Sequence, residues 1–89
     1  MEQIDHGIQI AVLDRGFVYV GRVKTDADWC YLTDAKNIRR WGTTGGLGEL
    51  AAHGPTESTK LNKAGSIQAP MKSLIHLIAV EASIWEKLL

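Results

Sequence analysis

The chain has 89 residues, of which 45% are hydrophobic and 22% charged, and its ten basic and ten acidic side chains give a formal net charge of zero. This composition is typical of one globular domain, and a chain so short buries only about 60–65% of the surface that its unfolded form exposes, which favours oligomerisation. The apolar run Leu74–Val80 is too short to span a bilayer. The N-terminus has Glu2 and Asp5 where a secretory signal would have basic residues. Cys30 is the single cysteine, which excludes an internal disulfide. We therefore expect one cytoplasmic domain over residues 1–89, with no metal and no cofactor.

The first half of the chain predicts an antiparallel meander. Apolar side chains alternate at a period of two in the first run, and aromatic and β-branched residues dominate the second. Asp14–Gly16 joins the two as a compact turn, in which Gly16 can adopt positive φ. Gly21 inside the second run indicates a bulge or bend. The predicted strands are 8–13, 17–23 and 29–33, the third with a possible continuation through 37–41.

The middle of the chain predicts a glycine-rich turn, a short helix and a polar loop. Residues 42–48 hold four glycines, which excludes a regular strand. Leu47, Leu50 and Ala51 have helical spacing, and Gly54 followed by Pro55 ends the helix. Residues 55–66 are polar and without periodicity, so we expect a loop that could close over a ligand as a lid.

The last third returns to apolar patterning. Residues 67–70 predict a short edge strand that ends at Pro70, and the β-branched run 74–80 favours a further strand over a buried helix. Trp29 and Trp85 are expected to pack in the core. The predicted fold class is α+β: a small, mainly antiparallel β-barrel or sandwich of SH3/Sm-like size, with a central helix at about 46–53 and a C-terminal helix at about 82–88.

The glycine-rich segment is the first candidate ligand site. It ends a predicted strand and opens a predicted helix, where free backbone amides and the helix dipole attract anions. Threonine hydroxyls can donate to phosphate, arginines supply charge, and an indole can stack on a nucleobase. It is neither a Walker A loop nor a dinucleotide-binding fingerprint. The alternative is a flexible connection whose glycines serve turn geometry alone. The candidate residues are Arg39, Arg40, Trp41, Thr43, Thr44, Gly45 and Gly46.

Strand alternation separates the two arginines. In a regular strand Arg39 shares a face with Trp41, whereas Arg40 shares the other face with Ile38, and a kink would reverse this assignment. Lys60 and Lys63 in the polar segment could close over a bound phosphate or could simply be solvated.

Charge is unevenly distributed although its total is zero. Residues 1–34 carry a net charge of −3, whereas residues 35–72 carry +4. A basic middle on a neutral chain favours a focused anion site over a broad nucleic-acid surface. Solvated surface lysines remain the simpler interpretation.

No arrangement of residues indicates catalysis. His6, His53 and His76 lie far apart in the sequence, and neither a serine nor Cys30 belongs to a recognisable nucleophile motif. Cys30 is expected to be a small buried hydrophobic residue. An enzyme is therefore the least favoured class of function.

Two segments resemble a known family. The residues from Leu32 to Gly42 and from Leu47 to Gly54 are similar to the patterns Leu-x-Asn-Ala-Arg-Arg-Ile-x-x-Trp-x-Gly and Ser-Leu-x-x-Leu-Ala-x-x-Gly of short uncharacterised bacteriophage proteins. Asp34 departs from this pattern, as do Lys36-Asn37 and Gly46, which replaces a helix-capping serine. The resemblance spans about residues 8–80 and implies a phage origin.

A phage protein without catalytic residues is expected to act by binding. Our leading hypothesis is an oligomeric anti-defence protein in the infected host's cytoplasm that sequesters a nucleotide immune messenger, either a cyclic oligonucleotide or a cyclic ADP-ribose derivative. The alternatives are a protein-binding inhibitor or structural phage module that docks on a host or phage protein, and a small-barrel nucleic-acid binder.

Overall fold

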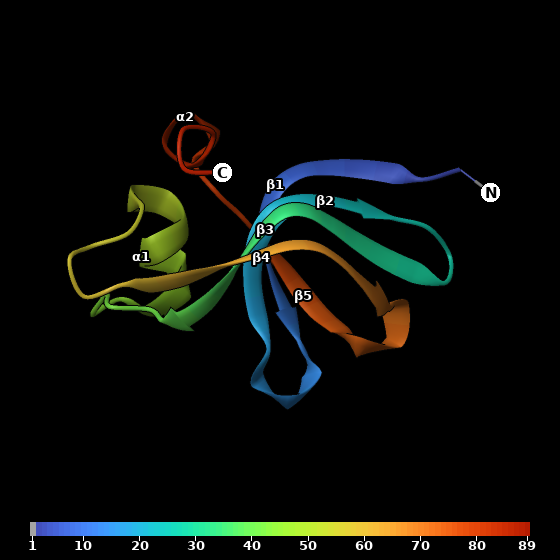
Figure 1. Ribbon diagram of the computed structural model, residues 1–89, viewed down its shortest axis with the longest axis horizontal. Coiled ribbons are helices and arrows are strands. Elements are labelled where there is room, and N and C mark those ends of the chain that lie inside the picture. Colours follow the sequence, from blue (N-terminus) through green and yellow to red (C-terminus); the bar gives the residue numbers. More distant parts are fainter. Residues whose placement is uncertain (1) are drawn as a thin grey trace.

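The computed structural model describes residues 2–89 and contains one five-stranded antiparallel sheet with two short helices (Figure 1). The strands are ordered β4-β3-β2-β1-β5, so β4 and β5 form the two edges. The strands are β1 (Ile4–Leu13), β2 (Val18–Thr25), β3 (Trp29–Arg40), β4 (Lys60–Pro70) and β5 (Leu74–Ala79), and the α-helices are α1 (Gly46–His53) and α2 (Ala82–Trp85). A small, mostly β member of the α+β class is therefore confirmed. No helix within residues 2–89 is long and apolar enough to cross a membrane.

The strands bend sharply near their middles, as the ribbon of β1 shows (Figure 1). Gly21 in β2 allows this bend, because a Cβ there would lie 3.0 Å from both the Thr33 carbonyl oxygen and the Ala35 Cα. The register between β2 and β3 shifts at the same place, between Val20 and Arg22. The bulge or bend predicted at Gly21 is thus confirmed.

The core lies on both faces of the sheet. Ile10 belongs to a cluster that α1 and α2 cover, whereas the adjacent Ala11 belongs to a second cluster with Val23, Cys30 and Leu32. The centre of β1 therefore has no solvent-facing side, since Ile10 and Ala11 are both fully buried. Burial on two faces follows from the bend, which folds the sheet over its own second cluster.

Trp85 of α2 packs against both α1 and the sheet. Its side chain is fully buried, and its indole Nε1 donates to the Ala51 carbonyl at 3.2 Å. The Glu81 amide donates to the same oxygen at 2.9 Å. Ala51 lies in the last turn of α1, where carbonyls have no partner inside the helix, so the C-terminal segment completes the hydrogen bonding of α1. Packing of Trp85 within its own chain is confirmed.

Three expectations need correction. The residues predicted as a polar loop (55–66) form a strand from Lys60 onward, because an edge strand half exposed to water needs no apolar periodicity once its backbone pairs with β3. α2 is shorter than predicted, with hydrogen-bonded turns over 86–88. Trp29 is 39% exposed instead of buried, since it begins β3 beside the turn from β2.

The remaining elements agree with the sequence. β3 is one continuous strand, β5 is a strand, Pro70 ends the edge strand β4, and Cys30 is buried. Gly54 has φ of 85° at the C-terminus of α1, as a glycine helix stop requires. Closure of the sheet into a barrel is not part of the observed pairing of the described strands.

Truncation of Trp85 to Ala should lower the free energy of unfolding by about 3–5 kcal/mol, because it empties the space between α1 and the sheet. Trp85→Phe should cost less, since it keeps most of the packing and leaves the Glu81 amide on the Ala51 carbonyl. Urea unfolding measures both. Equal losses for the two variants would show that the indole hydrogen bond, and not packing, dominates.

Gly42 and Gly48 provide a matched pair of substitutions. Gly42 has φ of 69°, and a Cβ there would overlap the Ser58–Thr59 peptide, so Gly42→Ala should be destabilising. Gly48 lies inside α1 with open space around it, so Gly48→Ala should stabilise the protein by about 0.5–1 kcal/mol. Thermal unfolding of the two variants should shift in opposite directions.

Candidate functional site

The ladder between β3 and β4 brings basic residues directly opposite one another. Lys36 pairs with Lys63, and Arg40 pairs with Lys60. Like charges at facing positions of an antiparallel pair are destabilising. With Arg39, these residues form what we call the cationic ribbon: Lys36, Arg39, Arg40, Lys60 and Lys63. Its charge opposes the stability of the ribbon itself, which is typical of residues kept for binding.

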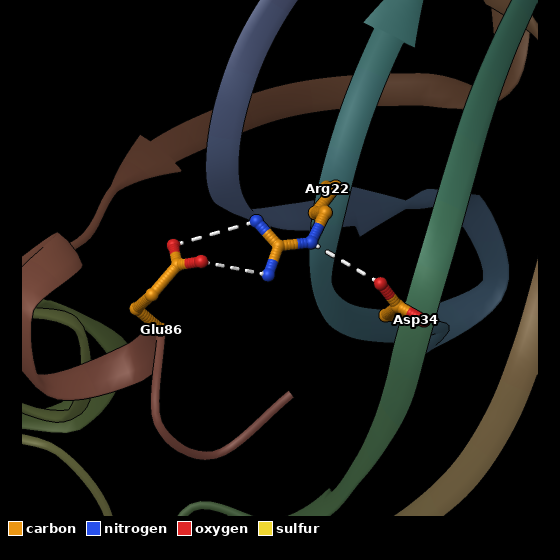
Figure 2. Close-up of polar contacts among 3 residues, drawn as sticks. All are labelled: Arg22, Asp34 and Glu86. Carbon is orange, nitrogen blue, oxygen red and sulfur yellow. Dashed lines mark hydrogen bonds and ion pairs between the residues drawn. The ribbon is translucent and has the colours of Figure 1, made fainter.

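No carboxylate within 4.0 Å neutralises this ribbon in the part of the chain that the structure describes. Both ion pairs found within residues 2–89 belong to Arg22, which contacts Asp34 at 3.2 Å and Glu86 at 3.0 Å (Figure 2). The five basic groups of the ribbon have no acidic side chain within 4.0 Å in the described part of the chain. An anionic ligand would therefore meet uncompensated positive charge.

The two arginines line one depression. The register shifts between Ile38 and Arg40, so β3 carries one more residue than β4 at this point. Arg39 and Arg40 consequently surround the same depression, together with Lys60 and Asn62, and its volume is about 370 Å³. We call it the arginine depression. Strict alternation would have separated the two arginines, and the bulge is the kink that removes this separation.

Lys63 lies on the face of the sheet opposite the arginine depression. Ile38 and Leu61 are register partners that face the core under α1, and the pair Lys36–Lys63 lies two residues further along the same face. Asn62, which lines the arginine depression, points to the opposite face. Lys63 therefore does not join Lys60 in one site.

Trp41 follows the arginine depression directly along the chain. Its side chain is 44% exposed, and its carbonyl accepts the Thr59 hydroxyl at 2.6 Å, next to the Arg40–Lys60 pair. The ring lies over Gly46, where a Cβ would be 3.8 Å from Cζ3. Trp41 is thus a half-exposed aromatic side chain next to the start of α1, at the end of the cationic ribbon.

The glycine segment at the start of α1 uses several of its donors internally. The Gly45 amide donates to Glu49 Oε1 at 3.0 Å, and the Thr43 hydroxyl donates to the Gly46 carbonyl at 2.6 Å. The carboxylate of Glu49 therefore already occupies the anion position at this amide. The capping-box pattern places a glutamate three residues after the N-cap, so Glu49, four residues after Gly45, does not match it. The phosphate role of Thr43, Thr44, Gly45 and Gly46 stays a prediction.

The other reactive side chains are dispersed. Burial raises the pKa of the Cys30 thiol, which keeps it protonated at neutral pH. His6 Nε2 lies 2.8 Å from the Thr25 hydroxyl, whereas His76 is exposed on β5. Two backbone amides, from Asp28 and Trp29, hold the pKa of Asp26 below its ordinary value by hydrogen bonding the carboxylate of this turn residue.

The structure thus brings together Arg39, Arg40 and Lys60 with Asn62, a residue of the polar segment 55–66 whose side chains were expected to be able to bind an anion. Comparison with known proteins found no matching family model, curated protein or solved structure. The resemblance to bacteriophage proteins stays a prediction, and the candidate function rests on the chemistry of the cationic ribbon and Trp41.

Charge reversal at Lys60 should stabilise the free protein. Lys60→Glu converts the Arg40–Lys60 repulsion into an attraction across the ladder, with an expected gain of about 0.2–1 kcal/mol that shrinks as salt is added. Lys72→Glu is the matched control, because Lys72 is exposed in the turn between β4 and β5. Thermal unfolding at low and high salt measures the difference. An equal effect in the control would remove the repulsion argument.

Proposed function

We propose that this protein binds a phosphate-bearing nucleotide in the arginine depression and sequesters it without chemical change. The observation that supports this most is the Arg40–Lys60 pair, which lies beside Arg39 and Asn62 with no carboxylate near it in residues 2–89. Guanidinium groups bind phosphate through two parallel hydrogen bonds, and the Asn62 amide can donate a further one.

Trp41 gives the proposal its nucleotide component. A phosphate alone needs no aromatic neighbour, whereas a base gains stacking energy on an exposed indole face. Trp41 directly follows Arg40 in the chain, and we expect a ligand held by the cations to reach its ring.

The ligand class within this proposal is a nucleotide immune messenger, a cyclic oligonucleotide or a cyclic ADP-ribose derivative, held by a phage protein in the host cytoplasm. The sequence resemblance supports the phage context. A focused cluster of cations on a chain of zero net charge supports a small ligand over a long nucleic acid. Oligomerisation would add the stability that so small a chain lacks.

Thermal unfolding against a panel of these messengers tests the proposal. A ligand at about 100 times its Kd should add roughly 2.7 kcal/mol of stability, which corresponds to several degrees. The shift should disappear in Arg40→Ala and weaken in Trp41→Ala, while Lys72→Ala should keep it. Denaturation of the complex should release the nucleotide unchanged.

Four outcomes would contradict the proposal. A shift that survives Arg40→Ala would place the ligand elsewhere, and recovery of a cleaved nucleotide would indicate an enzyme. Binding of single-stranded oligonucleotides with a steep salt dependence, and none of the messengers, would favour the nucleic-acid binder. No shift with any of these ligands would leave a protein partner as the better hypothesis.

A further inference from the structure

A second depression lies on the opposite face of the cationic ribbon, beside the C-terminal turn. Its volume is about 380 Å³, and its polar lining includes Lys36 and Lys63. Leu88 and Leu89 form its apolar side, and Gly65 leaves open space where a side chain would otherwise stand. We call it the lysine depression. Cations on one side and leucines on the other are the lining that an amphiphilic anion requires.

The two lysines are held together by the sheet. Lys36 and Lys63 are direct register partners, and the register shifts next to them, between Ala35 and Lys36. Neither lysine has a carboxylate within 4.0 Å in residues 2–89. A bound carboxylate between them would replace their repulsion with two charge-assisted hydrogen bonds.

Arg22 links two segments that border this depression. Its Nε donates to Asp34 on β3 at 3.2 Å, and its guanidinium donates to both Glu86 oxygens, at 3.0 and 3.4 Å (Figure 2). Asp34 lines the depression, and Glu86 precedes the two lining leucines in the chain. Arg22 therefore connects β3 to the C-terminal turn. Asp34 and Glu86 both pair with Arg22, and neither pairs with Lys36 or Lys63.

Both ion pairs of Arg22 are exposed, so we expect them to contribute little to global stability and to act mainly on the local position of Glu86. Asp34 adopts a positive φ of 52°, which is unfavourable for a residue other than glycine. This conformation brings its carboxylate to Arg22, which in turn holds the leucine side of the depression in place.

We propose that the lysine depression binds a small amphiphilic carboxylate, with its carboxylate between Lys36 and Lys63 and its hydrocarbon part against Leu88 and Leu89. This site is separate from the arginine depression, because the two lie on opposite faces of the ribbon. It does not depend on the proposed nucleotide function.

Hexanoate, hexan-1-ol and acetate are the probes that test this site. Hexanoate has both the charge and the chain, hexanol has only the chain, and acetate only the charge. Titration followed by amide chemical shifts should move Lys36, Lys63, Gly65 and Leu88 with hexanoate, and much less with the other two. Equal shifts with hexanol would reduce the site to an apolar surface, and equal shifts with acetate would reduce it to a simple anion site.

Variants locate the binding. The double variant Lys36→Ala/Lys63→Ala should weaken hexanoate about tenfold or more, whereas Lys72→Ala should not. Arg22→Ala, which leaves both lysines, should also weaken hexanoate but leave acetate unchanged, because it releases only the leucine side. Hexanoate affinity that survives the double variant would overturn the proposal. Messenger binding in the double variant should remain, which separates this test from that of the arginine depression.

Discussion

The burial of Trp85 is the interaction on which the rest of the molecule depends. Its ring fills the space between α1 and the sheet, and its indole shares the Ala51 carbonyl with the Glu81 amide. Gly54 is part of the same arrangement, since a Cβ there would lie only 2.8 Å from Ile84 Cγ2. A helix of eight residues is marginal in isolation, so α1 persists because the chain returns to cover and complete it. Once α1 is fixed, the ends of β3 and β4 are fixed as well.

The segment between β3 and β4 converts this packing into a preformed site. Thr59 donates to the Trp41 carbonyl and Thr56 to the Gly42 carbonyl, at 2.6 and 2.7 Å, so the two strands stay together where α1 leaves and returns. The repulsion between Arg40 and Lys60 is tolerated because these backbone contacts surround it. The residues that position the backbone of the site are thus different from those that supply its positive charge. Threonines and glycines hold the backbone, and the basic side chains remain available to a ligand.

Much of this fold follows from local sequence, and the part that does not follow is the edge of the sheet. Gly21, Gly54 and the alternation in β1 determine a bend, a helix end and a strand through the sterics and burial of single residues. The first part of β4, residues 60–66, has no such signal, because an edge strand is held by backbone hydrogen bonds that any residue except proline can make. The site shares this difficulty. Arg39 and Arg40 could be identified from composition, but their convergence depends on a bulge whose cause is the register with β4.

The burial of β1 on both faces has a further consequence for local motion. Amide exchange with solvent requires opening of the ladder, and opening is most difficult where neighbouring residues such as Ile10 and Ala11 are both fully buried. β4 is the opposite extreme, with one hydrogen-bonded neighbour and mostly exposed side chains. We therefore expect amide protection to decrease from β1 outward to β4. Both depressions lie at the β3–β4 edge, where we expect the least protection. An anion that contacts both strands would slow the opening of this edge, so its binding would change backbone order without a change of conformation.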